Sequence, residues 1–313
     1  MPPKRKAKFD LSQLATEKAN PAARELDTKS AIEIARIINA EDAKVAAAVQ
    51  RVLPQIANAI DWAANALRSG GRIIYVGAGS SGRIAALDAA ECPPTFNTNP
   101  KMVQFVIAGG TKALAGAVES DEDSGQLGVK EIRRKRPGKN DVVVGLAASG
   151  RTPFTVAAIK YARRAGAKTI GITSNAHSPL EKAAELAIVV ATGPEVVAGS
   201  TRMKAGTAEK MVLNILSTGA MVRLGYVYGN LMVNLHRKNS KLAERSVSIV
   251  QQALGVKEED ALRALKNAKN SVLVAIVMSK ADVKREVAVQ VLTRTGGHAR
   301  NAITLAKKMQ KMQ

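Results

Sequence analysis

Apolar residues in the first quarter of the chain recur every three or four positions, a spacing typical of amphipathic helices. Ser30 followed by Glu33 has the pattern of a capping box, in which each side chain hydrogen-bonds the backbone N–H of the other residue. The pattern predicts two helices that end near residues 69–71 (Ser-Gly-Gly), with Pro54 either in the first turn of the second helix or kinking it. Residues 1–29 are polar and charged, and we expect an extended or partly ordered N-terminal arm.

Short apolar runs alternate with helical patterns through the middle of the chain. The runs predicted to be buried strands are Arg72–Ala78, Val103–Ala108, Asp141–Ala147, Lys168–Thr173 and Ala187–Ala191. Helical patterns such as Arg83–Ala90 and Pro153–Ala165 lie between them. This alternation predicts an α/β fold with a doubly wound parallel sheet and helices on both faces. In such sheets, ligands bind beyond the carboxyl ends of the strands.

The strand pattern fades after Gly206, and the rest of the chain is predicted to be helical. Two long helices are expected at Thr207–Leu224 and Asn230–Leu254. Four short helices are then predicted at Lys257–Lys269, Ser271–Met278, Lys280–Leu292 and His298–Met309. We therefore expect three parts: the arm (1–29), a large α/β domain (30–252) and a small all-helical C-terminal domain (253–313).

Composition changes this picture mainly through charge. The chain has 47 Lys and Arg against 26 Asp and Glu, a formal net charge of +21. Nucleic-acid binding is the first function that such a charge suggests. However, the charge is spread out, its small clusters are not interleaved with aromatic residues, and no helix-turn-helix or zinc-finger spacing is present. We expect no nucleic-acid partner, and a positive field would also attract an anionic substrate.

The chain contains one cysteine, Cys92, so an internal disulfide or a cysteine-rich metal site is excluded. The basic N-terminus is not followed by an apolar segment of the kind found in secretory signals. Nowhere do about 18 consecutive apolar residues occur, so no membrane span is expected. These features favour a cytoplasmic location.

Two loops of similar composition follow two of the predicted strands. Residues 77–83 read GAGSSGR and residues 147–153 read AASGRTP. Glycine allows backbone N–H groups to approach a ligand, hydroxyl groups add donors, and the following helix N-terminus favours an anion. The serines would also serve simply as helix N-caps, but two such loops in one sheet favour a phosphate site. The candidate binding residues are Gly79, Ser80, Ser81, Gly82, Ser149, Gly150, Arg151 and Thr152.

The first loop also matches the dinucleotide-binding pattern G-x-G-x-x-G, at Gly77, Gly79 and Gly82. A dinucleotide site additionally requires an acidic residue near the end of the next strand. That strand ends in Ile107-Ala108-Gly109-Gly110 and carries no acid. The loop is rich in hydroxyl groups, which suits a terminal phosphate better than a pyrophosphate, so nicotinamide binding is disfavoured.

A third donor-rich segment, residues 199–207 (GSTRMKAGT), again joins a strand to a helix. Ser200 and Lys204 are candidate ligands for a charged group. Arg202 is a further cation in the same segment, although a solvated helix start is the simpler interpretation of both basic residues.

Carboxylates that can carry acid–base chemistry lie in two places. Glu91 is predicted at a helix C-terminus, just before Pro93 and Pro94, where a negative charge opposes the helix dipole. An ordinary surface glutamate is the alternative interpretation. Residues 117–124 (AVESDEDS) form an acidic cluster in which like charges can raise one pKa toward neutrality. An elimination reaction needs such a base together with an acid, but spacing alone does not choose between Glu119 and Glu122.

Taken together, these motifs identify a family resemblance. GAGSSGR, DAAECPPT (88–95), AVESDEDS, ASGRTP and GSTRMKAGTA (199–208) closely resemble the N-acetylmuramic acid 6-phosphate etherases, members of the sugar-isomerase (SIS) superfamily. TEKANP at 16–21 and RIINAED at 36–42 are similar to the N-terminal stretch of that family. The resemblance extends from about residue 12 to at least 250. The combination of ECPPT with STRMKAGTA is the specific part of it.

The resemblance implies a lyase that cleaves the D-lactyl ether of N-acetylmuramic acid 6-phosphate, giving N-acetylglucosamine 6-phosphate and D-lactate, in cell-wall amino sugar recycling. The family works on the ring-opened sugar by elimination and then adds water, without a metal or an organic cofactor. Glu91 matches the acid that protonates the departing lactate. Glu122 matches the second catalytic carboxylate, a candidate base for the C2 proton, and the serine loops match the 6-phosphate site.

The resemblance also implies a homodimer with the site near the subunit interface. Two positions depart from the common pattern of the family: Asn234 stands where many members carry aspartate, and Ala19 where a basic residue is frequent. Neither departure touches the two carboxylates, so they bear on substrate contacts and not on the chemistry.

Three alternatives remain at this point. A non-catalytic sugar-phosphate sensor resembling the glucokinase regulatory protein shares the SIS architecture, but that protein is about twice as long. An aldose–ketose isomerase of the same fold commonly uses a glutamate or histidine base, yet His177, His236 and His298 lie outside the loops described above. A transcriptional regulator would need a DNA-binding module, and the sequence contains no recognisable one.

Overall fold

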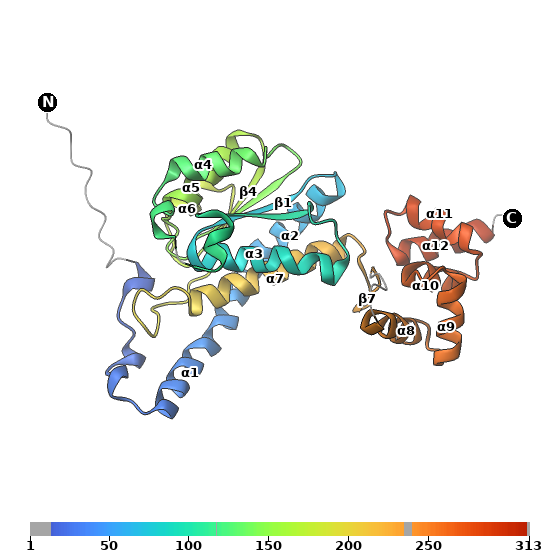
Figure 1. The fold of residues 1–313 in the computed structure, drawn as a ribbon, viewed down its shortest axis with the longest axis horizontal. Coiled ribbons are helices and arrows are strands. Elements are labelled where there is room, and N and C mark those ends of the chain that lie inside the picture. The colour runs from blue at the N-terminus through green and yellow to red at the C-terminus, as the bar shows by residue number, and fades with distance from the viewer. Residues whose placement is uncertain (1–13, 117, 235–239, 312–313) are drawn as a thin grey trace. The chain divides into compact units, whose positions relative to one another are not determined.

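The computed structural model describes residues 14–116, 118–234 and 240–311, which form two compact units. The first unit contains the chain up to Asp88 together with Val103–Leu216. The second contains Ala89–Met102 and the chain from Ser217 onward. The domain boundary predicted near residue 252 lies within the second unit, whose helices after residue 239 are coloured orange to red in Figure 1.

The first unit is built on a five-stranded parallel sheet, as the alternating pattern predicts. Its strands are β1 (Ile73–Gly77), β2 (Val103–Ile107), β3 (Val142–Leu146), β4 (Lys168–Thr173) and β5 (Leu186–Val189). They lie in the order β2-β1-β3-β4-β5, with every neighbouring pair parallel. All five residues of β1 and of β3 are buried. Continuous apolar runs of this kind are typical of strands that are covered on both faces.

The helices of this unit are α1 (Ala31–Gln50), α2 (Leu53–Arg68), the first half of α3 (Gly79–Phe96), α4 (Gly125–Arg134), α5 (Pro153–Arg164), α6 (Pro179–Ala183) and most of α7 (Lys204–Arg223). Ile74 and Val76 of β1 belong to the same core cluster as Ile159 of α5. Tyr75 points to the opposite face, because successive strand residues alternate. Its hydroxyl donates a hydrogen bond of 2.8 Å to Asp88 of α3. Helices therefore cover both faces of the sheet, and the predicted fold class is confirmed.

The N-terminal part of the described chain is more ordered than the composition suggests. Three short 3-10 turns, at Ala15–Glu17, Pro21–Ala23 and Leu26–Thr28, lead into α1. The capping box predicted at Ser30 and Glu33 is confirmed, with Ser30 N donating to Glu33 Oε2 at 2.9 Å. Pro54 lies in the first turn of α2, where its missing N–H leaves no hydrogen bond unmade.

The prediction that Pro93 and Pro94 stop the helix is wrong. Helix α3 continues through both prolines to Phe96, and the N–H of Asn97 bonds the carbonyl of Pro93 at 2.8 Å. A proline inside a helix removes one hydrogen bond to the residue four positions earlier, so two carbonyls of this helix lose their usual donors. Glu91 consequently lies inside the helix and not at its end.

A single helix over Asn230–Leu254 was also a wrong prediction. The segment begins with a small antiparallel hairpin, β6 (Val227–Tyr228) and β7 (Leu231–Met232), and α8 (Ser240–Leu254) follows. Gly229, with a φ of +63°, and Asn230 form the two-residue turn of the hairpin. A Gly-Asn pair is a recognised signal for such a turn, because it tolerates the positive φ that the turn requires.

Four helices follow α8 in the second unit, at the places predicted but with shifted ends: α9 (Glu258–Asn267), α10 (Val272–Ala281), α11 (Arg285–Arg294) and α12 (Ala299–Gln310). They share a hydrophobic core to which α10 contributes most, with Val274, Ala275, Ile276 and Val277 all buried. Among the described residues, no helix is both long and apolar enough to cross a lipid bilayer.

Candidate functional site

The first loop is folded so tightly that glycine is required at two of its positions. A Cβ atom on Gly77 would lie 2.8 Å from the backbone nitrogen of Gly82. A Cβ atom on Gly82 would lie 2.6 Å from Cγ1 of Ile107, at the end of the neighbouring strand β2. These close approaches bring the N-terminus of α3 directly against the carboxyl ends of β1 and β2, where an anion would meet its free N–H groups.

Glu122 joins the first loop to the second. A Cβ atom on Gly79, which has a φ of +52°, would lie 2.9 Å from Glu122 Oε1, so the carboxylate rests against the first loop. The backbone carbonyl of Glu122 accepts a hydrogen bond of 3.1 Å from Phe154 N, in the first turn of α5. Glu122 therefore lies beside the first loop through its side chain and beside the start of α5 through its backbone.

Arg83 anchors the segment that leads toward the acidic cluster. Its guanidinium donates to the carbonyl oxygens of Ala113, at 2.8 Å, and Gly116, at 2.6 Å. Residue 117, the first of the predicted acidic cluster, lies outside the described residues, and so does the side chain of Glu119. Residues 113–116 are thereby attached to the start of α3.

The second loop packs against residues that follow strand β4. A Cβ atom on Gly150, whose φ is +67°, would lie 2.3 Å from Ser178 Oγ. The hydroxyl of Ser149 accepts a hydrogen bond from Arg151 N at 3.2 Å. Asn175 donates to the carbonyl of Ala148 at 3.0 Å. Asn175 and Ser178 were not predicted, although they lie in a segment that joins a buried strand to a helix, the same signal that marked the other loops.

Asn175 also ties the N-terminal segment to this edge of the sheet. Its Oδ1 accepts from Ala15 N at 2.9 Å, and its amide nitrogen lies 3.2 Å from the buried hydroxyl of Thr16. Thr16 in turn accepts a hydrogen bond at its carbonyl from Gly199 N, in the third segment. The described part of the segment predicted to be an N-terminal arm therefore packs against the second and third loops.

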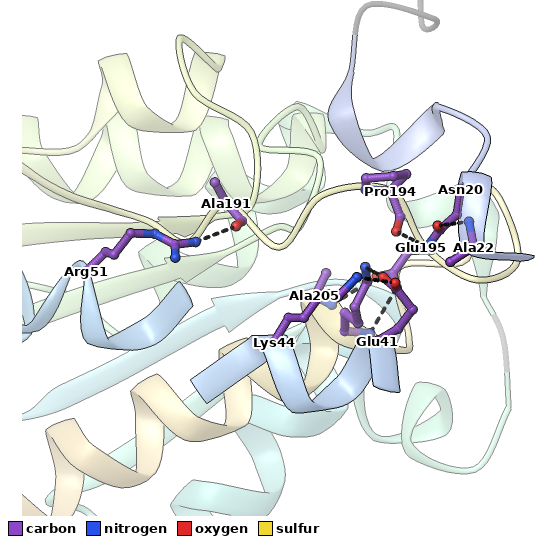
Figure 2. Close-up of polar contacts among 10 residues, drawn as sticks. Asn20, Ala22, Glu41, Lys44, Arg51, Ala191, Pro194, Glu195 and Ala205 are labelled. Atoms are coloured by element: carbon purple, nitrogen blue, oxygen red, sulfur yellow. Dashed lines mark hydrogen bonds and ion pairs between the residues drawn. The ribbon is translucent and has the colours of Figure 1, made fainter. Parts of the chain in front are cut away.

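The third segment does not present Lys204 to solvent. Lys204 is 1% exposed, and its Nζ lies 2.5 Å from Glu41 Oε2 of α1. Lys44 pairs with the other oxygen of Glu41 (Figure 2). Ser200 and Thr201 remain partly exposed, and Arg202 is exposed. The charge of Lys204, predicted to contact substrate, is engaged in this structure by a buried carboxylate.

Glu195 completes this cluster at the first turn of α7. Its two oxygens accept hydrogen bonds from the backbone nitrogens of Lys204, at 3.0 Å, and Ala205, at 2.9 Å. Figure 2 shows Glu195 and Glu41 converging on this helix start. Burial raises the pKa of Glu41, but hydrogen bonds from Lys204, Lys44 and Asn20 outweigh it and bring its pKa to about 2. Burial raises the pKa of Glu195, and its backbone hydrogen bonds only partly offset this effect.

A further glutamate, Glu209, lies behind the first loop and was not predicted. It is 2% exposed, and its Oε1 lies 2.9 Å from the hydroxyl oxygen of Ser81. Its Oε2 is buried with no hydrogen-bond partner. Burial raises the pKa of Glu209 to about 8, which the Ser81 hydrogen bond opposes. Nothing in the local sequence marks this residue, because its contact with Ser81 spans 128 positions of the chain.

Glu91 is exposed and lies on the part of α3 that belongs to the second unit. The contacts that gather Glu122 with the two loops do not include it. His177 and His298 take no part in those contacts either, and His236 lies outside the described residues. Within the described ranges, no group of three or more histidine, cysteine or acidic side chains is arranged to hold a metal ion.

Comparison with known families and proteins agrees with this architecture. Residues 55–163 match the model of the glucokinase regulatory protein N-terminal SIS domain, and residues 136–218 match the SIS domain. An N-acetylmuramic acid 6-phosphate etherase of Symbiobacterium thermophilum is 54% identical over 276 residues, covering 88% of this chain and 91% of that protein.

Two further relatives cover almost the whole chain. N-acetylmuramic acid 6-phosphate etherase 2 of Vibrio parahaemolyticus is 49% identical, over 95% of this chain and 99% of that protein. N-acetylmuramic acid 6-phosphate etherase 1 of Bacillus licheniformis is 46% identical, over 95% and 98% respectively. Identity at this level, sustained across both units, shows that the chain belongs to the N-acetylmuramic acid 6-phosphate etherase family.

Proposed function

We propose that this protein is a carbon–oxygen lyase that cleaves the D-lactyl ether of N-acetylmuramic acid 6-phosphate. The products are N-acetylglucosamine 6-phosphate and D-lactate, and one water molecule is consumed. The reaction belongs to the catabolism of cell-wall amino sugars, which is a cytoplasmic process. Family membership supports the substrate, and the two loops at the carboxyl edge of the sheet support a phosphorylated sugar.

The chemistry follows from the open-chain sugar, in which the C1 aldehyde makes the C2 proton acidic. A carboxylate removes that proton, the C3–O bond to lactate breaks, and an acid protonates the departing oxygen. Water then adds to C3 of the unsaturated aldehyde, and a proton returns to C2. In this series of steps, every proton is moved by a carboxyl group or by water. The backbone amides and hydroxyls of the loops hold the 6-phosphate.

Glu122 is the proposed base. Its carboxylate rests against Gly79 of the first loop, and its backbone is held by the first turn of α5, which follows the second loop. A sugar whose phosphate occupied these loops would lie within reach of this carboxylate, and this contact is the observation on which the proposal depends. Ser80, Ser81, Ser149 and Thr152 are the proposed hydroxyl ligands of the phosphate.

Glu91 is the proposed acid, on the basis of its place in the family's ECPPT motif. Its exposed side chain leaves it free to act on a substrate bound at an interface between two copies of the chain. A homodimer is therefore part of the proposal. Light scattering on the purified protein measures its oligomeric state. A monomer at micromolar concentration would contradict the proposed homodimer.

The central test is an assay of D-lactate release from N-acetylmuramic acid 6-phosphate by the wild type and by Glu91→Ala and Glu122→Ala. The wild type should release lactate, and each variant should lose activity by about a hundredfold or more. Exchange of the C2 proton in deuterated water separates the two roles. Glu122→Ala should lose the exchange, whereas Glu91→Ala should keep it while failing to eliminate lactate.

A non-catalytic sugar-phosphate sensor is the second candidate, and the match to the glucokinase regulatory protein domain supports it. The same experiment separates the two functions. Tight binding of N-acetylmuramic acid 6-phosphate without lactate release by the wild type would favour the sensor and reject the lyase.

A further inference from the structure

Glu209 is a buried acid that the proposed mechanism does not use, yet it contacts the loop proposed to hold phosphate. Ser81, its partner, is 9% exposed and lies in the first turn of α3. Gly206, three residues earlier on α7, packs near Ile84 of α3, so the two helices hold this contact between them. The distance of 2.9 Å between Ser81 Oγ and Glu209 Oε1 permits a hydrogen bond with the proton on either oxygen.

We infer that Glu209 is a positioning residue that, in its protonated form, donates a hydrogen bond to Ser81 and thereby directs the Ser81 hydroxyl proton toward the bound phosphate. This inference rests on the proposed function, because it assigns the first loop to the substrate phosphate. It adds a pH-sensitive residue, located behind the loop, that controls how well the loop binds an anion.

The direction of the hydrogen bond follows from the surroundings of the two carboxyl oxygens. Oε2 is buried without a partner, so a proton placed there would be a buried donor with no acceptor. A proton on Oε1 instead reaches Ser81 Oγ, and the unpartnered Oε2 is then a carbonyl-type acceptor, which is the less costly atom to leave unsatisfied. A serine hydroxyl has one proton and two lone pairs. When its oxygen accepts from Glu209, its own proton remains available to donate.

Ionisation of Glu209 reverses this arrangement. A carboxylate can only accept, so Ser81 must turn its proton toward Glu209 and present lone pairs to the ligand. A phosphate dianion also only accepts, so it loses a donor and meets a negative charge behind it. Because burial raises the pKa of Glu209 to about 8, this reversal falls just above neutral pH.

The charged groups around Glu209 do not compete for this role. Charged side chains on the first turn of α7 and on α3, among them Lys204, Arg83 and Asp88, have partners of their own. Lys204 pairs with Glu41, Arg83 bonds two backbone carbonyls, and Asp88 accepts from a tyrosine hydroxyl. Only burial and the Ser81 hydrogen bond shift the pKa of Glu209, so its ionisation is governed by the contact described here.

The test measures binding of the product N-acetylglucosamine 6-phosphate between pH 7 and pH 9.5 by isothermal titration calorimetry. The second pKa of a phosphate monoester lies near 6, so the ligand keeps a constant charge over this range. Wild-type affinity should fall by about tenfold per pH unit above pH 8, and binding at pH 9 should take up about one proton. Proton uptake is obtained from the dependence of the binding enthalpy on the ionisation enthalpy of the buffer.

Three variants make the test specific. Glu209→Gln keeps a donor to Ser81 that does not titrate, so it should bind at pH 7 like the wild type, with a flat pH profile and no proton uptake. Ser81→Ala should bind about tenfold more weakly and likewise without proton uptake, and adding Glu209→Gln to it should change nothing further. Glu185→Gln, a glutamate paired with Lys168 at the opposite edge of the sheet, should retain the wild-type profile.

The outcomes separate this inference from the proposed function. Equal pH profiles in the wild type and Glu209→Gln would overturn the inference, and so would full proton uptake by Ser81→Ala. Lactate release by a wild type with a flat binding profile would overturn the inference alone. Proton-coupled binding without lactate release would uphold it and reject the lyase, and no binding by the wild type at pH 7 would overturn both.

Discussion

Two buried carboxyl groups at helix α7, Glu41 beside its first turn and Glu209 on the helix itself, lie in contrasting environments. At its first turn, Glu41 is buried against the ammonium groups of Lys204 and Lys44, and its pKa is held near 2. Five residues further along the helix, Glu209 is equally buried but contacts only a neutral hydroxyl, and its pKa is raised to about 8. Burial alone therefore does not decide the charge of a carboxyl group. The presence of a cation or of several N–H donors decides it.

Breaking the ion pair should have the largest effect on stability. Lys204→Met leaves Glu41 buried with only Lys44, which is 64% exposed at its side chain, as a cationic partner. We expect a loss of about 3–5 kcal/mol in the free energy of unfolding at pH 7, measured by urea denaturation. A double variant, Glu41→Leu with Lys204→Met, removes both charges and should recover most of the loss. A single variant as stable as the wild type would show that the pair contributes little.

The second prediction concerns the pH dependence that Glu209 imposes on stability. An unfolded glutamate has a pKa of about 4.3, whereas the folded pKa is about 8, so between these values the folded state binds more protons. The contribution of Glu209 to the unfolding free energy should therefore decline as pH rises from about 4.3 to about 8. Glu209→Gln should remove this decline and be the more stable protein at pH 8. Denaturation midpoints collected across this range measure the effect, and parallel curves for the two proteins would argue against a protonated Glu209.

An intermediate effect is expected at Glu195, whose two oxygens accept from two backbone N–H groups at the start of α7. Glu195→Gln replaces one acceptor by an NH₂ group that faces a donor. We expect a loss of about 1–3 kcal/mol, measured by thermal or urea denaturation at pH 7. Glu195→Asp retains two acceptors on a shorter side chain, so its loss of unfolding free energy should differ from that of Glu195→Gln. No loss with glutamine would indicate that the helix start adjusts to a single acceptor.

The smallest effect should come from a pair in water. Lys168 and Glu185 form an ion pair with side chains 51% and 34% exposed. Glu185→Gln should change the unfolding free energy by less than about 1 kcal/mol, and added salt should reduce even that difference. A change as large as that of Lys204→Met would contradict the distinction drawn between buried and exposed pairs.

Local patterns predicted the parts of the fold whose cause is itself local. The two central strands β1 and β3 are short runs rich in β-branched residues, and each candidate phosphate loop is a Gly and Ser cluster placed between such a run and a helix. The prediction failed where two signals met. Leu231 and Met232 of the hairpin merge in sequence with the apolar pattern of α8, and this pattern hides the turn at Gly229 and Asn230. At Pro93 and Pro94 a strong helix-stop signal was overridden in the folded chain.

The candidate site likewise has features that local sequence predicts and features that depend on distant segments. The motifs around Ser81, Ser149 and Glu122 are visible in the sequence, because the residue types and the strand–loop–helix context are both local. The preference for Glu122 over Glu119 comes from the family resemblance, and the structure places the Glu122 carboxylate against Gly79. The engagement of Lys204 by Glu41 depends on α1, a helix 163 positions away in the chain, and no spacing rule anticipates it.

The sequence by itself determined the sheet, the helices that flank it, the positions of the Gly- and Ser-rich loops and the family to which the chain belongs. These follow from periodicity and from motifs, which are properties of neighbouring residues. Only the tertiary structure decided which acids are charged and what they touch, because the pKa of a carboxyl group depends on burial and on partners contributed by distant segments. Glu41 and Glu209 have the same side chain, and the folded surroundings lower the pKa of Glu41 to about 2 and raise that of Glu209 to about 8.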